Sequence, residues 1–248
     1  MAGKLDGKVV VVTGGETGIG RAIVEKCLDD GAEVTAAGIN TDHLKSLDDS
    51  AATDRLLCVE TDVRDPVAIN DMLTETKDKF GRLDGAVANA GITLGQTPFV
   101  DITLEDWDTM LGMNLRSVFM TLQAAAKILV AQGEGGSLLA TGSSTAVRVA
   151  PGFASYIAAK GGVHAMMQAL ALELAENKIK ANTIVPGTTR SPLTEALPGY
   201  LEKVGPTLPM GEVVEPYELA NFVAFALSDE APHMTGTLLK VDAGRVLG

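Results

Sequence analysis

Cysteine, aromatic residues and positive charge are all scarce in this chain of 248 residues. Its two cysteines, Cys27 and Cys58, lie in separate apolar segments, so we expect buried thiols in a reducing compartment and no disulfide framework. The 20 lysines and arginines are outnumbered by 32 acidic residues. The resulting formal net charge of −12 argues against nucleic acid, an anionic membrane or an acidic protein as a partner.

Long apolar runs and metal-ligand clusters are missing as well. No segment approaches the roughly 18 consecutive apolar residues that span a bilayer, and the residues before Lys8 lack the apolar stretch of a signal peptide. No group of His, Cys and carboxylate side chains has metal-ligand spacing, so we expect no catalytic metal. The chain is 46% hydrophobic, which is typical of a packed globular protein, and we expect it to be cytoplasmic.

Short apolar runs that favour strands alternate with helical patterns along the whole chain. The strand candidates are residues 8–13, 33–37, 56–59, 85–88, 136–141, 181–185 and 237–241, and the helix candidates are 19–30, 67–80, 104–131, 155–177 and 218–228. This alternation predicts a doubly wound, Rossmann-type α/β fold, a seven-stranded parallel sheet with helices on both faces, in one domain of residues 1–248. The proline-rich segment 191–215 interrupts it and is predicted to be a lid-like substrate segment.

A glycine-rich loop follows the first predicted strand directly. It reads Thr13-Gly-Gly-Glu-Thr-Gly-Ile-Gly20 and opens into a helix. Glycines permit a tight turn and close backbone approach, while the start of a helix offers free amides and a positive dipole end. In the context of strand, loop and helix, this motif predicts a binding site for the pyrophosphate of a dinucleotide.

A tyrosine and a lysine stand four residues apart in the predicted helix 155–177. This spacing places Tyr156 and Lys160 on one face, where the ammonium is expected to lower the pKa of the phenol towards neutrality. A phenol with such a pKa exchanges a proton with an alcohol or ketone. Ser143, thirteen residues before the tyrosine, is a candidate to hold the substrate oxygen. On its own, however, the Tyr-x3-Lys spacing is better explained by chance.

Taken together, the motifs of this chain resemble those of the short-chain dehydrogenase/reductase family over nearly its whole length. The motifs that carry the resemblance are Thr13-Gly-x3-Gly-x-Gly20, Asp62-Val63, Asn89-Ala-Gly91, Asn114, Ser143, Tyr156-x3-Lys160 and Pro186-Gly187. The resemblance implies an NAD(P)-dependent enzyme that interconverts a secondary alcohol and a ketone. Tyr156 is then the general acid and base, Lys160 also contacts the nicotinamide ribose, and Ser143 orients the substrate oxygen. Asn114 corresponds to the family residue that holds a water; the alternative is a helical asparagine bonded to its own backbone.

The resemblance also implies the dinucleotide contacts. Besides Tyr156 and Lys160 they are Gly14, Glu16, Thr17, Gly18, Ile19, Gly20, Gly38, Ile39, Asp62, Val63, Asn89, Ala90, Gly91, Pro186, Gly187, Thr189 and Ser191. The end of the second strand should carry an acid for the adenosine ribose, but Gly38 stands there. The basic residue of an NADP site is missing too, since Thr17 and Ile39 occupy its usual positions. We expect NAD rather than NADP, because Glu16 would repel a 2′-phosphate.

The substrate side is less determined by the sequence. The candidate substrate contacts are Ser143, Arg148, Phe153, Leu193 and Leu197, although a solvated arginine is favoured for Arg148 and core or lid packing explains the three apolar residues equally well. His164 lies two turns after Tyr156 and is expected to be a packing or interface residue. We expect a small-molecule substrate and, by resemblance, a homotetramer, with a dimer as the alternative.

Two other functions remain in competition with a general alcohol dehydrogenase or ketone reductase. A 3-oxoacyl-[acyl-carrier-protein] reductase belongs to the same family, but its acidic carrier calls for a basic surface that this chain lacks. A non-catalytic dinucleotide-binding regulator is disfavoured by the complete set of Asn114, Ser143, Tyr156 and Lys160.

Overall fold

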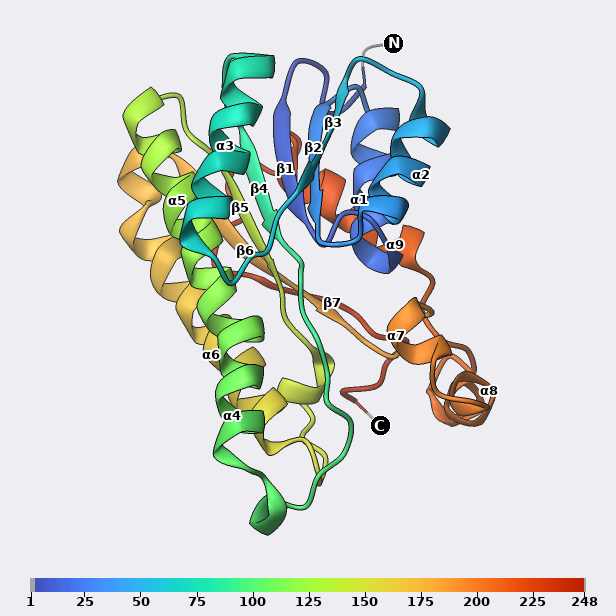
Figure 1. The fold of residues 1–248 in the computed structure, drawn as a ribbon. Coiled ribbons are helices and arrows are strands. Elements are labelled where there is room, and N and C mark those ends of the chain that lie inside the picture. Colours follow the sequence, from blue (N-terminus) through green and yellow to red (C-terminus); the bar gives the residue numbers. More distant parts are fainter. Residues whose placement is uncertain (1–2, 248) are drawn as a thin grey trace.

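The computed structural model describes residues 3–247, which form one seven-stranded sheet flanked by helices (Figure 1). All neighbouring strands are parallel, in the order β3-β2-β1-β4-β5-β6-β7. The strands are β1 (Val9–Thr13), β2 (Glu33–Gly38), β3 (Leu56–Glu60), β4 (Gly85–Ala88), β5 (Gly136–Thr141), β6 (Ile179–Pro186) and β7 (Leu238–Val241). The order reverses direction between β1 and β4, which is where ligands bind in open sheets of this kind. The predicted doubly wound fold is confirmed.

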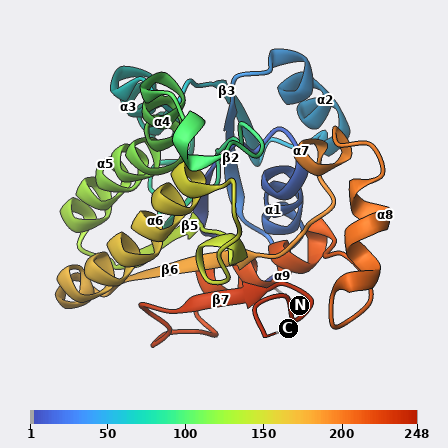
Figure 2. The same cartoon turned by 90° about the horizontal axis from the view of Figure 1, so that it is seen from below.

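Helices cover both faces of the sheet (Figure 2). On one face lie α1 (Gly18–Asp29), α2 (Thr41–Ala51) and α9 (Pro216–Leu227). The other face carries α3 (Pro66–Phe80), α4 (Leu104–Leu111), α5 (Ser117–Gln132) and α6 (Ala154–Glu173). Each layer of helices buries its own apolar cluster against the sheet. The valines of β1 are therefore buried on both faces, as a continuous apolar run in a parallel strand predicts.

The predicted helix 104–131 is interrupted in the structure. After α4 the chain forms a π-helical turn, Gly112–Arg116, before it continues as α5. Apolar spacing alone does not reveal such a turn, because the residues on both sides of it keep the helical pattern. The turn contains Asn114, and π-helical turns are often found at functional sites.

Helix α2 was not predicted. Its sequence is mostly polar and only Leu44 and Leu47 are buried, so it offers few apolar positions from which a helical pattern can be recognised. Its start is capped by Asn40, whose side chain accepts a hydrogen bond from the His43 backbone amide at 3.0 Å.

The segment 191–215 extends beyond the sheet on the side of α1 and α9 (Figure 2). It contains two short helices, α7 (Pro192–Glu195) and α8 (Tyr200–Val204), followed by a 3₁₀ turn (Gly205–Thr207). Its first residues lie against the glycine-rich loop, where a Cβ on Gly18 would be 3.3 Å from atoms of Ser191 and Pro192. Within residues 3–247, no helix has the length and apolar character needed to cross a bilayer.

Candidate active site

The glycine-rich loop connects β1 to α1 at the switch point of the sheet. Gly14 and Gly18 have positive φ angles of 62° and 53°, a conformation that favours glycine. A Cβ on Gly20 would lie 1.8 Å from the carbonyl oxygen of Gly14. These positions therefore exclude side chains, and the loop brings its backbone to the first turn of α1, where helix amides face outward.

Asn89, after β4, fastens this loop to the neighbouring strands. Its Nδ2 donates to the carbonyl oxygens of Thr13 and Gly14 at 3.2 and 3.3 Å, and its Oδ1 accepts from the Thr141 hydroxyl at 3.0 Å. The Thr13 hydroxyl in turn accepts from the backbone amides of Asn89 and Ala90. Thr13 and Thr141 are thus part of the site, although the sequence analysis did not assign either a role. Each is the last residue of its strand, and ligand sites in parallel sheets lie at the carboxyl ends of the strands, so this position could have indicated both residues.

Ser143, Tyr156 and Lys160 come together between β5 and α6. The Lys160 Nζ is buried and donates to the Thr141 carbonyl oxygen at 2.8 Å. The same Nζ lies 5.9 Å from the centroid of the Tyr156 ring. The Ser143 hydroxyl forms a side-chain hydrogen bond with Tyr156 that favours the phenolate, and it also accepts from the Thr145 amide at 3.1 Å.

The electrostatics of this group differ from the expectation. Burial raises the pKa of Tyr156, and the hydrogen bond with Ser143 offsets only part of that rise. Burial also lowers the pKa of Lys160 from 10.5 to about 8. The prediction that the lysine draws the tyrosine pKa towards neutrality is therefore wrong for the protein alone, because desolvation dominates at both groups. At neutral pH the phenol is protonated, which is the form a general acid requires.

Asn114 is fully buried in the π-helical turn, and its side chain is engaged on both sides. Its Nδ2 donates to the Met110 carbonyl oxygen at 3.1 Å, which is the bond to helix backbone considered above as the alternative. Its Oδ1 accepts from the Ile92 amide at 3.1 Å. A Cβ on Gly91 would be 2.7 Å from that Oδ1 and 3.4 Å from the Lys160 Nζ. Asn114 thus holds the backbone after Asn89-Ala-Gly91 against the π-helical turn, and this places Gly91 close to the Lys160 Nζ.

The remaining predicted dinucleotide contacts lie along the same edge of the sheet. Val63 is buried, whereas Asp62 is bound to Arg64 by an ion pair of 2.6 Å that lowers the Asp62 pKa. Gly187 packs against the β7 end, where an added Cβ would be 2.5 Å from the Asp242 Cα. Glu16 extends from the glycine-rich loop to the end of β2, where its Oε1 accepts from the Ile39 amide at 3.3 Å.

Thr17, Ile19, Pro186, Thr189 and Ser191 complete this set. Thr17 is the N-cap residue of α1, Ile19 lies in its first turn, and Pro186 ends β6. The Thr189 hydroxyl donates to the Gly187 carbonyl oxygen at 3.1 Å. Ser191 caps α7 by a capping box with Thr194.

The predicted substrate residues are less closely grouped. Arg148 is exposed and its Nη1 donates to the Arg245 carbonyl oxygen at 2.9 Å, so it holds the C-terminal segment. Leu193 and Leu197 in and after α7 are about half exposed, at 48% and 50%, and Phe153 caps the start of α6. A surface cavity beside α8 is lined by Arg190, which is paired with Glu215 at 2.9 Å. None of Ser143, Tyr156 and Lys160 borders that cavity.

His164 has a closer relation to the site than the sequence indicated. It is buried, and its Nε2 accepts from the backbone amide of Ser143 at 3.3 Å. A Cβ on Gly142 would be 2.3 Å from that nitrogen, so the glycine is needed for the contact. His164 supports the loop that presents Ser143. Among the described residues, no three His, Cys, Asp or Glu side chains are grouped as metal ligands would be.

The chain is similar to known proteins over nearly its whole length. A family model described as enoyl-(acyl carrier protein) reductase matches residues 14–245. A putative short-chain type dehydrogenase/reductase of Mycolicibacterium smegmatis is 34% identical over 100% of both chains. A 3alpha-hydroxysteroid dehydrogenase of Mediterraneibacter gnavus is 35% identical over 96% of both. The crystal structure of a 3-ketoacyl-(acyl-carrier-protein) reductase from Brucella melitensis, complexed with NADH, superposes with a TM-score of 0.93 at 29% identity, covering 98% of this chain and 100% of its own.

Proposed function

The chain belongs to the short-chain dehydrogenase/reductase family, and we propose that Ser143, Tyr156 and Lys160 carry the proton-transfer half of its reaction. The protein is an NAD(P)-dependent oxidoreductase that interconverts a secondary alcohol and a ketone. A bound nicotinamide ring takes or supplies the hydride. The observation that carries the assignment is the meeting of a protonated phenol, a serine hydroxyl and a buried ammonium next to the glycine-rich loop.

In ketone reduction, Tyr156 donates a proton to the carbonyl oxygen while the Ser143 hydroxyl hydrogen-bonds the same oxygen. In alcohol oxidation the deprotonated tyrosine accepts the proton, and its hydrogen bond with Ser143 favours that phenolate. Among the described residues, the Lys160 Nζ donates to one partner, the Thr141 carbonyl oxygen, which leaves two of its three donors for other groups. Those donors suit the nicotinamide ribose. Asn114 acts as a positioning residue that keeps the Gly91 backbone beside the lysine.

The residues at the switch point fit a dinucleotide. The glycines at 14 and 20 let the loop pack closely, since a Cβ on Gly20 would lie 1.8 Å from the Gly14 carbonyl oxygen, and the first turn of α1 supplies amides for a pyrophosphate. We favour NAD over NADP, because the Glu16 carboxylate lies at the end of β2, where it would repel a 2′-phosphate.

The substrate is proposed to be a small molecule with a secondary alcohol or a ketone. The reductase from Brucella supports a 3-oxoacyl carrier substrate as a second candidate. The net charge of −12 favours a free small molecule over an acidic carrier protein. A regulator without catalysis is the weakest alternative, because it has no use for a protonated tyrosine held by Ser143.

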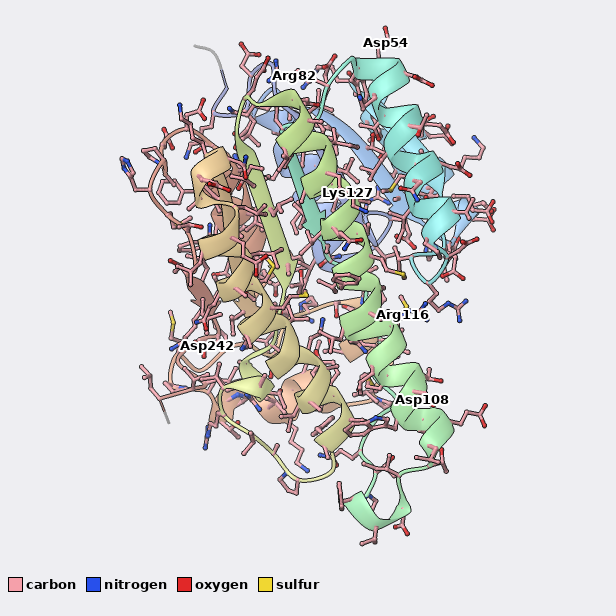
Figure 3. All side chains as sticks on the ribbon, turned by 90° about the vertical axis from the view of Figure 1, so that its left-hand side faces the viewer. Asp54, Arg82, Asp108, Arg116, Lys127 and Asp242 are labelled. Carbon is pink, nitrogen blue, oxygen red and sulfur yellow. The ribbon has the colours of Figure 1, made fainter. Side chains whose placement is uncertain are left out.

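A homotetramer is the proposed assembly. Figure 3 shows α4 and α5 following one another along one line, with α6 beside them and with Arg116 and Lys127 on the α4–α5 line. These helices expose large apolar residues, namely Leu104 at 81%, Phe119 at 44% and Leu172 at 83%. A second apolar patch on α9 contains Tyr217, Phe222 and Phe225. A solution mass near 25.7 kDa, that of one chain, would contradict any assembly.

The decisive experiment is Tyr156→Phe. It removes one hydroxyl and leaves the ring, so turnover in both directions should be lost while dinucleotide affinity stays close to that of the wild type. Activity is followed through the absorbance of reduced nicotinamide with both coenzymes and a panel of alcohols and ketones. Full activity in Tyr156→Phe would refute the assignment, and tight coenzyme binding without turnover in the wild type would favour the regulator.

A further inference from the structure

Glu16 occupies an unusual position between the glycine-rich loop and the sheet. Glu16 is only 9% exposed, although a glutamate in a surface loop is normally solvated. The Oε1 accepts from the Ile39 amide at 3.3 Å, whereas the Oε2 is buried and has no hydrogen-bond partner among residues 3–247. A buried carboxylate oxygen without a donor is costly and calls for an explanation.

Gly38, the last residue of β2, makes this position possible. A Cβ on Gly38 would lie 2.1 Å from the Cδ and from the Oε2 of Glu16, and 2.4 Å from its Oε1. The carboxylate therefore fills the space that a side chain at the end of β2 would take. Gly38 has no positive φ, so conformational freedom does not explain the glycine, and the space taken by Glu16 does.

In dinucleotide sites of this fold, the end of the second strand is where an acidic side chain accepts hydrogen bonds from the adenosine ribose. We propose that Glu16 is that acid in this protein, delivered from the glycine-rich loop instead of from β2, and that Gly38 is the complementary residue that makes room for it. The ligand chemistry is a ribose with a free 2′-hydroxyl, whose O–H groups supply the donor that the Oε2 lacks. The inference rests on the proposed dinucleotide site and assigns its specificity to one pair of residues.

A 2′-phosphate is a poor ligand for this arrangement. A ribose that carries a 2′-phosphate has no 2′-hydroxyl to donate to the Glu16 Oε2. The phosphate also brings negative charge towards a buried carboxylate.

The test compares Glu16→Gln with Glu25→Gln. Both remove one negative charge from the same stretch of chain, but Glu25 is 51% exposed and pairs with Arg21 on the surface. Glutamine keeps an acceptor for the Ile39 amide, so the fold should persist, which is checked by circular dichroism and urea unfolding. Dissociation constants are measured by nicotinamide fluorescence for NADH, NADPH and 2′-deoxy-NADH.

For the wild type we expect 2′-deoxy-NADH to bind about 10- to 100-fold more weakly than NADH, the range for one charge-assisted hydrogen bond. In Glu16→Gln this penalty should shrink and the preference for NADH over NADPH should fall about tenfold or more. Glu25→Gln should retain both wild-type ratios. The double variant Glu16→Ala with Gly38→Asp returns the acid to β2 and should recover the preference for NADH that Glu16→Ala alone loses.

The possible failures are distinct. If the wild type binds neither NADH nor NADPH, the dinucleotide site itself is wrong and the inference falls with it. If NADH binds well but the 2′-deoxy penalty is the same in Glu16→Gln and Glu25→Gln, the dinucleotide site stands and Glu16 is only a structural residue. A wild-type preference for NADPH likewise overturns the inference. The wild-type comparison of NADH with 2′-deoxy-NADH needs no variant and remains decisive if Glu16→Gln fails to fold.

Discussion

Replacing Lys160 with methionine should remove a pH dependence from the folding stability of this protein. Burial lowers the pKa of Lys160 from 10.5 to about 8, so the unfolded chain binds this proton more tightly than the folded one. The folding stability that this burial costs is absent above pH 10.5. The cost increases as the pH falls towards 8 and is fully present below pH 8. At about 1.4 kcal/mol per pH unit, it amounts to about 3 kcal/mol at neutral pH.

Methionine has a similar length and carries no charge, so Lys160→Met has no such cost at any pH. It does lose the hydrogen bond to the Thr141 carbonyl oxygen, a loss of about 1 kcal/mol or more that is independent of pH. The informative quantity is therefore the change with pH. The difference in unfolding free energy between the variant and the wild type should decrease by about 2.5 kcal/mol from pH 7 to pH 10.

The assay is urea unfolding without dinucleotide, followed by the fluorescence of Trp107, the single tryptophan, at several pH values. Cys27, Cys58 and Tyr156 all have pKa values raised by burial and lower the stability at alkaline pH, but they are present in both proteins and largely cancel in the difference. Lys127→Met, at an exposed position on α5, is the control and should keep the wild-type profile. A free-energy difference between Lys160→Met and the wild type that stays constant from pH 7 to pH 10 would refute the reasoning.

Three further outcomes follow from the site. Because burial raises the pKa of Tyr156, kcat/KM for alcohol oxidation should rise from neutral to alkaline pH while ketone reduction does not; a level oxidation profile would contradict this. Gly142→Ala should cost about 1–3 kcal/mol of stability and most of kcat, since its Cβ would lie 2.3 Å from the His164 Nε2 and displace Ser143. Gly161→Ala in α6, with nothing within 4 Å of the added Cβ, should instead gain about 0.5–1 kcal/mol in urea unfolding, and a loss would indicate a close contact between chains.

Several parts of the site follow from short stretches of sequence. The valines of β1, the loop that ends at Gly20 and the start of α1 are adjacent in the chain, so local rules predict both their structure and their position at the end of the sheet. Tyr156 and Lys160 share a face of α6 because one helical turn separates them. Helix α2 shows where such rules fail, since a mostly polar helix with two buried leucines offers too few apolar positions for its pattern to be recognised.

Other properties depended on contacts between distant segments. The pKa of Tyr156 is set by burial rather than by the nearby lysine, and no spacing in the sequence reports how deeply a group is buried. The role of His164 depends on a hydrogen bond to Ser143, which is 21 residues away along the chain.

By itself, the sequence predicted most of the strands and helices and the glycine-rich loop, because these depend on the periodicity and spacing of neighbouring residues, and the family resemblance of its motifs made Ser143, Tyr156 and Lys160 the candidate reacting group. Only the tertiary structure decided how those residues are solvated and what supports them. Glu16 filling the space above Gly38 is the clearest instance, since the two residues are brought together by the pairing of β1 with β2. Desolvation and close packing arise from segments far apart in the chain, and both take their values only when the sheet has formed.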